Sequence, residues 1–464
     1  MCWQPTQQPG SARQRASTRR PAGRRPARAA AARALVLVLT LCALCAAALA
    51  PAALAARPTP EEDPFYRYEG STPLAEIAPG TVLKTRTLAY HVAGVPLPVK
   101  AVQLLYRSTG ERGEPTVNVT SVLERLHMGA APKVVAYQSF YDSLNPEDDP
   151  SYAIAGGLSF GGLIPDVEST LIAPELLAGD AVVVADTEGE SAAFAAGRVY
   201  GLNTLDSLRA ALRSPATGLA GSTQVALMGY SGGAIATEWA AELAPGYAPE
   251  VDRMIVGASF GGVLVDPAHN LHYVSASEEW AGVIPMGLIG TARAFHVDLK
   301  PYLSEYGLEL YEKLQKASII QVLGRYPGLT WEELAKPEYA NPESIPVYVE
   351  SANELIMGTG GTPTAPLLIA QGAGGEREGT NGEQPGIGPG DGVMIAGDVR
   401  TLAREYCERG VQVQYDEHPK LAHVETALPW MLSTLSWLHA RFAGEPAPQD
   451  CATIAPGNPL TPIG

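Results

Sequence analysis

The stretch Val225-Ala226-Leu227-Met228-Gly229-Tyr230-Ser231-Gly232-Gly233-Ala234 decides the fold of this 464-residue chain. It begins with apolar residues, as a buried strand does, and residues 234–241 have the composition of a helix. Between them lies Gly-x-Ser-x-Gly, because a tight strand-to-helix turn has no room for side chains two residues on either side of its serine. The N–H groups that open the helix point towards the serine hydroxyl. Ser231 is therefore the predicted nucleophile, with a packing turn of small residues as the alternative.

The first 56 residues differ from the rest of the chain. Residues 1–33 hold eight arginines and no acidic residue, and residues 34–50 are an apolar run that small residues follow. This order is typical of a secretory signal, and it predicts cleavage near Ala55-Ala56. A membrane anchor is the alternative, but the apolar run is short and rich in alanine for a span. We therefore expect a secreted protein.

Without this leader the chain is strongly acidic. Eight of the 33 basic residues lie in the leader, which leaves 25 against 49 acidic residues and a net charge near −24. Such a surface disfavours nucleic acids and anionic membranes as partners. The content of 46% hydrophobic and 18% charged residues is that of an ordinary globular protein.

The cysteines divide between the leader and the rest of the chain. Cys2, Cys42 and Cys45 lie in the leader, which leaves Cys407 and Cys451. Two cysteines in an exported chain predict a disulfide, here one that ties the tail to a helix, and two free thiols are the alternative. No histidines and cysteines have metal-ligand spacing, so we expect no metal and no cofactor.

Short apolar segments alternate with helical segments along the chain. We expect strands at 81–91, 95–107, 133–138, 180–186, 225–228, 251–257, 345–350, 366–371 and 411–415, and helices at 204–212, 397–409 and 426–442. This alternation predicts an α/β protein with a mostly parallel sheet, and with the serine turn it predicts an α/β-hydrolase fold over residues 57–464. Ligands bind beyond the carboxyl ends of such strands, where Ser231 would lie. Residues 57–80, rich in proline and acid, would form an extended arm.

Residues from about 265 to 340 interrupt this alternation. Segments 275–297 and 301–323 have helical periodicity and carry apolar residues that would be exposed. Because the interruption falls between the nucleophile strand and the later strands, it predicts a helical cap over the site. Packing of the same residues into an ordinary core is the alternative.

A serine hydroxyl needs a base, which is usually a histidine that a carboxylate holds. Three histidines follow the expected cap. His439 lies within a helix, and His418 at the end of the last strand remains an alternative. His423 lies just before the final helix, where it can reach back over the strand ends, and is the predicted base.

The acid is expected between the serine and the histidine in chain order. Asp391 stands in a glycine-rich loop after the strand at 366–371, and we predict it as the acid. Glu350, Glu354 and Asp398 are the alternatives. Asp391-Gly392 is also a turn dipeptide, which would give Asp391 a structural role.

The tetrahedral intermediate needs two donors for its oxyanion. One is expected to be the N–H of Gly232, which directly follows the nucleophile. The other should come from the loop after an early strand, and the N–H of Asp142 is the candidate there.

Further segments stand in a specific order along the chain. They are Asp63-Pro64-Phe65-Tyr66, Pro79-Gly80-Thr81-Val82-Leu83, Gln103-Leu104-Leu105-Tyr106-Arg107-Ser108, Tyr141-Asp142-Ser143-Leu144, Gly229-Tyr230-Ser231-Gly232-Gly233 and Gly390-Asp391-Gly392-Val393. In this order, with the segment around His423, they resemble the secretory lipase family, secreted α/β-hydrolases of yeasts and actinobacteria. The resemblance implies Ser231 as nucleophile, His423 as base and the N–H groups of Asp142 and Gly232 as oxyanion hole. It also implies a helical cap and ester hydrolysis, often of lipids.

The chain departs from this family in two places. The family's acid often lies in a compact Asp-Glu-x-x-Pro turn directly after its strand, whereas here the long stretch 372–390 precedes Asp391. Some relatives carry a cysteine shortly after the segment that contains Asp142, where this chain has Asn145-Pro146-Glu147-Asp148-Asp149.

We therefore expect a secreted serine carboxylic ester hydrolase, a lipase that cleaves medium or long acyl esters, such as triacylglycerols, through an acyl-enzyme. Its partners would be a small-molecule ester or lipid, with transient contact at a lipid interface. A polyester depolymerase or an acyltransferase with the same triad is the alternative among enzymes. A binding protein on an inactive hydrolase scaffold is the alternative from another class.

Overall fold

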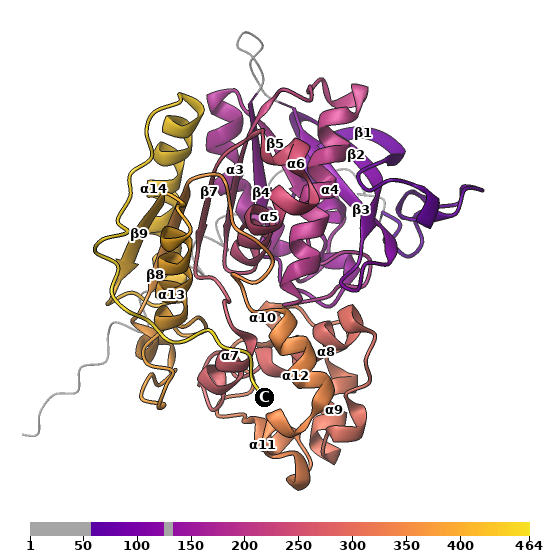
Figure 1. Cartoon of the computed structure of the whole chain (residues 1–464). Coiled ribbons are helices and arrows are strands. Elements are labelled where there is room, and N and C mark those ends of the chain that lie inside the picture. Colours follow the sequence, from indigo (N-terminus) through magenta and orange to yellow (C-terminus); the bar gives the residue numbers. More distant parts are fainter. Residues whose placement is uncertain (1–56, 125–132) are drawn as a thin grey trace, which may run out of the picture. The chain divides into compact units, whose positions relative to one another are not determined.

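The computed structural model describes residues 57–124 and 133–464. The expected leader, its cleavage site near Ala55-Ala56 and the first three cysteines lie outside the described residues. A nine-stranded sheet with the order β1-β2-β3-β5-β4-β6-β7-β8-β9 organises the described chain (Figure 1). The strands are β1 Val82–Val92, β2 Val95–Thr109, β3 Pro115–Leu123, β4 Lys133–Gln138, β5 Ala181–Ala185, β6 Gln224–Tyr230, β7 Ile255–Gly261, β8 Leu367–Gly372 and β9 Val413–His418.

The sheet is antiparallel at one side and parallel through the rest. Strands β1, β2, β3 and β5 pair antiparallel. The neighbours from β5 through β4, β6, β7 and β8 to β9 all pair parallel. A mostly parallel sheet of this order, with helices on both faces, confirms the predicted α/β-hydrolase fold.

Helices cover both faces of the sheet. Val134 and Ala136 of β4 pack into one hydrophobic cluster with α4 Gly197–Arg213, α5 Gly232–Tyr247 and α13 Ala396–Glu408. Val135 and Tyr137 of the same strand pack into another cluster, with α3 Leu163–Ala178 and α14 His423–Phe442. This alternation along one strand, with both sets buried, is why the strand reads as a continuous apolar run in the sequence.

A helical segment joins β7 to β8. It contains α7 Pro267–Val274, α8 Val283–Phe295, α9 Glu305–Lys313, α10 Ile319–Val322, α11 Trp331–Leu334 and α12 Pro346–Glu354, which gather beyond the ends of the strands in Figure 1. Apolar residues of this insertion, among them Ile284, Ile289 and Trp331, form a hydrophobic cluster of their own. Most of its apolar residues that were expected to be exposed are therefore buried, and the helical segment continues past residue 340.

The strand expected at 345–350 is wrong, because these residues begin α12. Pro346 stands in the first turn, where its fixed φ suits a helix. Ile345, Tyr348, Ala352 and Leu355 are buried, and their spacing of three and four residues puts them on one helical face. Apolar residues at 345, 347 and 349 alternate as in a strand. The segment is nevertheless helical, because the face formed by Ile345, Tyr348, Ala352 and Leu355 packs into the interior.

Both ends of the described chain are attached to the sheet domain. The expected extended arm contains two short 3₁₀ turns, and its Asp63 carboxylate lies 2.5 Å from the guanidinium of Arg86 in β1. At the other end, Cys407 of α13 and Cys451 form a disulfide. Among the described residues, none of the helices is long and apolar enough to span a membrane.

Candidate active site

Ser231 lies at a sharp turn between β6 and α5. Its backbone has φ +55° and ψ −122°, a conformation that residues with a side chain rarely adopt. The flanking glycines are required by close contacts, because a Cβ at Gly229 would lie 2.1 Å from the carbonyl oxygen of Gly233, and one at Gly233 would lie 2.0 Å from that of Gln138. The sequence thus folds into the predicted strand, turn and helix, with the serine at the carboxyl end of the strand.

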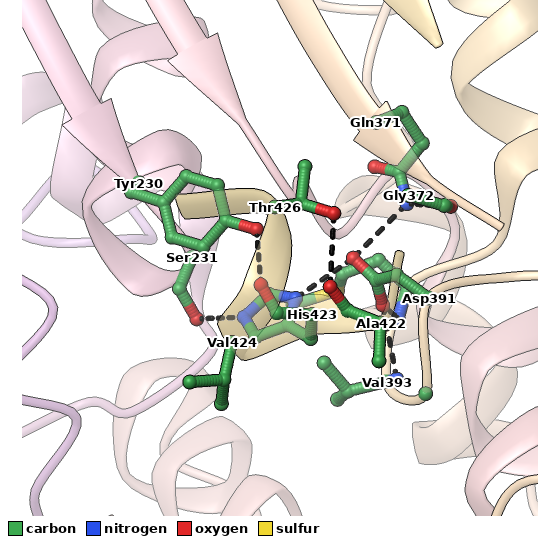
Figure 2. Close-up of polar contacts among 12 residues, drawn as sticks. Tyr230, Ser231, Gln371, Gly372, Asp391, Val393, Ala422, His423, Val424 and Thr426 are labelled. Carbon is green, nitrogen blue, oxygen red and sulfur yellow. Dashed lines mark hydrogen bonds and ion pairs between the residues drawn. The ribbon is translucent and has the colours of Figure 1, made fainter. Parts of the chain in front are cut away.

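Ser231, His423 and Asp391 form a continuous chain of hydrogen bonds (Figure 2). The Ser231 hydroxyl lies 2.8 Å from His423 Nε2, and His423 Nδ1 lies 2.7 Å from Asp391 Oδ2. The structure therefore brings together the three side chains that the sequence singled out. With the Nδ1 proton directed at Asp391, Nε2 is free to accept the serine proton.

Backbone donors fix Asp391 in its buried loop. Its Oδ1 accepts hydrogen bonds from the N–H groups of Val393 and Met394 at 3.1 and 2.7 Å. Its Oδ2 accepts a third from the side chain of Gln371 at 3.0 Å. These donors hold the carboxylate towards His423. Asp391 therefore has both expected roles, because it shapes the Asp-Gly turn and hydrogen-bonds to His423.

His423 is the first residue of α14 rather than part of the loop before it. Its N–H donates to the carbonyl oxygen of Asp391 at 2.8 Å, and its own carbonyl oxygen accepts from Tyr230 at 2.6 Å. Burial lowers the pKa of His423, but the carboxylates of Asp391, Glu378 and Asp142 raise it, and the pKa ends above its usual value. A raised pKa makes the imidazole a stronger base.

The alternative acids and bases lie in other contacts. Glu350 and Glu354 are exposed on α12, and Glu350 pairs with Arg112. Asp398, in the first turn of α13, contacts His269 and Asn458. His439 pairs with Glu175, and His418 ends β9. Of these acids and histidines, His423 is the one that hydrogen-bonds to Ser231, and Asp391 is the one that hydrogen-bonds to His423.

The carboxylate of Asp142 lies directly against Gly232. Burial raises the pKa of this carboxyl to about 7, although the imidazole of His423 and the N–H of Gly232 lower it. Two buried glutamates hold the loop, since Glu168 accepts from the N–H of Phe140 at 2.8 Å and Glu188 from that of Ser143 at 3.1 Å. The sequence pointed to the N–H of Asp142, but it gave no sign that the carboxylate also faces the site.

A pocket opens at Ser231, Gly232 and Asp142 and extends among the helices of the insertion. Its walls are almost entirely apolar. They include Leu271, Val274, Ile284, Leu288, Leu299 and Leu355. Such a lining binds a hydrocarbon chain well and offers little to a charged or highly polar group.

Sequence comparison agrees with this geometry. Residues 157–376 match the secretory lipase family. A protein of Mycobacterium tuberculosis described as a probable inactive lipase is 31% identical over 398 residues, which are 83% of each chain. This chain belongs to the secretory lipase family. Lipase 2 of Candida albicans is 30% identical over 84% of this chain and 83% of its own.

A solved structure agrees as well. The match to Candida antarctica lipase A in its closed state covers 87% of this chain and 91% of that chain, with a TM-score of 0.74 and 26% identity. The family and these neighbours support a carboxylic ester hydrolase of the lipase type.

One group of possible metal ligands lies elsewhere in the described chain. Within residues 57–124 and 133–464, Glu175, Asp180 and His439 bring three ligand atoms within 4.8 Å of one another. Asp180 lies directly before β5, at the amino end of that strand, whereas Ser231 follows the carboxyl end of β6. His439 Nε2 already lies 3.1 Å from Glu175, so the group is a side-chain cluster separate from the site.

Two further residues beside His423 escaped the sequence analysis. The ring of Trp280 from the insertion meets the imidazole edge to face, with 5.2 Å between centroids, and Glu378 accepts a hydrogen bond from the Trp280 indole. Trp280 lies in segment 275–297 of the expected cap, and Glu378 lies in the glycine-rich stretch before Asp391. A single sequence carries no signal that these two segments meet at the histidine.

Proposed function

We propose that this member of the secretory lipase family hydrolyses carboxylic esters of medium or long acyl chains through an acyl-enzyme on Ser231. The proposal is carried by one observation: the unbroken hydrogen-bond chain from Ser231 through His423 to Asp391 starts at the mouth of an apolar pocket. An acyl chain in the pocket would bring its ester carbonyl to the serine hydroxyl. The family and its lipase relatives support the same reaction class.

In the first half of the reaction, Ser231 Oγ bonds to the ester carbonyl carbon while His423 Nε2 takes the hydroxyl proton. The negative charge then moves to the carbonyl oxygen, which would accept hydrogen bonds from the N–H groups of Gly232 and Asp142. Asp391 stabilises the imidazolium and holds its tautomer. The carbon–oxygen bond to the alcohol breaks as His423 returns the proton to the leaving oxygen.

In the second half, a water molecule takes the place of the alcohol. His423 removes a proton from this water as its oxygen attacks the acyl carbon, and Ser231 leaves with the proton that the imidazole returns. The products are a carboxylic acid and the free enzyme. No step requires a group beyond the side chains and N–H groups described above.

Export through the basic and apolar leader is part of the same proposal. The order of arginines, apolar run and small residues supports a signal that is removed near Ala55-Ala56. The disulfide between Cys407 and Cys451 suits an oxidising compartment.

The test is hydrolysis of p-nitrophenyl esters from C2 to C16 by the protein without its leader, beside Ser231→Ala. Serine-dependent turnover that is strongest at C8 or longer supports the proposal. Turnover that peaks at C2–C4 retains the mechanism and rejects the long acyl substrate. The absence of serine-dependent turnover at every length rejects the proposal.

A non-catalytic binding protein is the second candidate, because the relative from Mycobacterium tuberculosis is described as probably inactive. The two candidates differ in how Ser231 reacts with a fluorophosphonate probe. A catalytic serine is labelled within minutes and Ser231→Ala is not, whereas a binding scaffold leaves both proteins unlabelled.

A further inference from the structure

The glycine-rich stretch before Asp391 connects the helical insertion to the catalytic side chains. The N–H of Glu278 donates to the carbonyl oxygen of Gly379 at 3.1 Å, and the hydroxyls of Ser277 and Thr380 lie 2.7 Å apart. Thr380 also donates to the carbonyl oxygen of Gly392, which directly follows Asp391. The stretch thus joins residues 277–280 of the insertion to the loop that holds the acid.

Glu378 is the central contact of this connection. Its Oε2 accepts a hydrogen bond from the indole nitrogen of Trp280 at 2.8 Å, and its Oε1 accepts one from the N–H of Val424 at 3.1 Å. Val424 is the second residue of α14, so this N–H is one of those that a helix leaves unpaired at its start. A carboxylate at this end also interacts favourably with the helix dipole. Glu378 therefore links the insertion to the first turn of the helix that presents His423.

The imidazole of His423 contacts two aromatic rings. The ring of Tyr230, from β6, lies 5.1 Å away between centroids, and that of Trp280 lies 5.2 Å away at 81°. Gly392 makes room for this arrangement, because a Cβ there would lie 2.7 Å from Glu378 Oε2 and 2.9 Å from the Trp280 indole nitrogen. A side chain at Gly392, the residue after Asp391, would therefore clash with the two groups that form the Glu378–Trp280 hydrogen bond.

We propose that Glu378 is a positioning residue for His423: it holds Trp280 against the imidazole, fixes the first turn of α14 and places a further carboxylate, besides those of Asp391 and Asp142, beside the imidazolium that forms during the reaction. This inference rests on the proposed function of His423 as the base. Because Trp280 belongs to the insertion, the hydrogen bond makes the surroundings of the base depend on the position of the insertion. The long stretch 372–390 then has a role in the site.

The charges around these two groups make the effect measurable. Asp391, Glu378 and Asp142 are the carboxylates that face His423. Burial raises the pKa of Glu378, while His423, the Trp280 indole and the Val424 N–H lower it and Asp391 raises it. The neighbouring Arg377 is paired with Glu425 at 2.6 Å. Removal of the Glu378 charge should therefore lower the pKa of His423.

The experiment compares Glu378→Gln with Glu376→Gln, which removes the same charge from an exposed position of the same turn. The pH dependence of kcat/KM is measured with p-nitrophenyl butyrate, a short ester that makes little use of the deep pocket. We expect Glu378→Gln to shift the acidic limb of the pH profile of kcat/KM to lower pH by about half a unit. It should also lower kcat/KM at the plateau of the profile about tenfold. Glu376→Gln should match the wild type in both.

Trp280→Phe provides an independent variant, because it keeps a ring beside His423 and removes the indole donor. It should lower kcat/KM while moving the acidic limb less than Glu378→Gln does. Melting temperatures of all variants separate lost positioning from lost folding. A Glu378→Gln profile that coincides with that of Glu376→Gln overturns the proposal.

The imidazole pKa is also measured without turnover, by NMR of the protein with labelled histidine. A lower His423 pKa in Glu378→Gln than in Glu376→Gln supports the proposal even if the wild type hydrolyses no ester, and an equal pKa rejects it. Failure of ester hydrolysis would reject the proposed function alone, so the two failures are distinguishable.

Discussion

The carboxylate of Asp142 occupies the space above Gly232, where a Cβ would lie 1.8 Å from Asp142 Oδ1. An alanine at this position therefore has to displace the Asp142 side chain and the loop that carries it. Because both residues supply the expected oxyanion donors, we predict that Gly232→Ala lowers kcat about 100-fold or more, as loss of one such donor does. Gly246→Ala in the same helix is the control, since a Cβ there meets nothing within 4 Å. Wild-type turnover by Gly232→Ala would contradict this role.

The pH dependence of activity should report on Asp142. Burial raises its pKa to about 7, although His423 and the Gly232 N–H lower it. Above this pH the ionised carboxylate repels the oxyanion, so kcat/KM should fall as the pH rises through about 7. On the acidic side, activity is lost as His423 gains its proton, at a pH above the usual histidine value.

Asp142→Asn tests this assignment. The variant should lose the alkaline decline, and its acidic limb should move to lower pH because one carboxylate that raises the pKa of His423 is gone. The measurement is kcat/KM from pH 5 to 9, with the rate of Ser231→Ala subtracted at each pH. An unchanged alkaline limb in Asp142→Asn would assign the decline to another group.

The apolar pocket should set the preferred acyl length. Leu288 of α8 lines it, so Leu288→Trp should fill part of the space that a long chain needs. We expect kcat/KM for a C12 ester to fall about tenfold or more relative to the C2 ester, because a new side chain excludes the distal methylenes. Leu177→Trp on the exposed surface of α3 is the matched control. Equal losses on both esters would place the acyl chain elsewhere.

The sequence predicted those parts of the site that depend on contacts within one turn or on the order of residues along the chain. The glycines around Ser231 are required by contacts within the turn and with β4, and chain order led to Asp391 and His423 because both follow strands of the same sheet. The alternation of apolar strands and helices indicates the sheet in which these strands lie. The same alternation also predicted the parallel part of the sheet, from β5 to β9.

The parts that the sequence missed depend on contacts between distant segments. The apolar face of Ile345, Tyr348 and Ala352 became helical because the insertion has its own core for it to pack against. The carboxylate of Asp142 and the contact between Glu378 and Trp280 both join segments that lie far apart in the chain. The pattern of residues predicts the local structure of each segment on its own. That the segments carrying Asp142, Trp280 and Glu378 meet at His423 follows only from how they pack in the folded chain.

The disulfide should contribute to stability. It joins Cys407 and Cys451, which are 44 residues apart, and so restricts a long loop in the unfolded chain. Replacing both cysteines by serine should lower the free energy of unfolding by about 2–4 kcal/mol. Urea denaturation monitored by circular dichroism gives this difference, and thiol titration of the unfolded wild type checks the bond. Two reactive thiols in the wild type would remove the basis of the prediction.

Glu111 should make stability depend on pH. It is buried at the start of the β2–β3 turn, where its Oε2 accepts a hydrogen bond from the N–H of Val199 at 2.9 Å, and its Oε1 has no partner among the described residues. Burial raises its pKa from 4.5 to about 8, although the Val199 N–H lowers it. The folded protein therefore holds the proton more tightly than the unfolded chain does.

The sign of the effect follows from this difference. The contribution of protonated Glu111 is complete below pH 4.5 and is lost as the pH rises from there through about 8. Glu111→Gln cannot ionise at this position and should lack this loss. From pH 5 to pH 8, the free energy of unfolding of the wild type should therefore drop by roughly 2–4 kcal/mol more than that of Glu111→Gln. Exposed Glu309→Gln is the control and should follow the wild type. Urea midpoints at both pH values give the comparison, and parallel changes in Glu111→Gln and wild type would show that Glu111 is ionised in the folded protein.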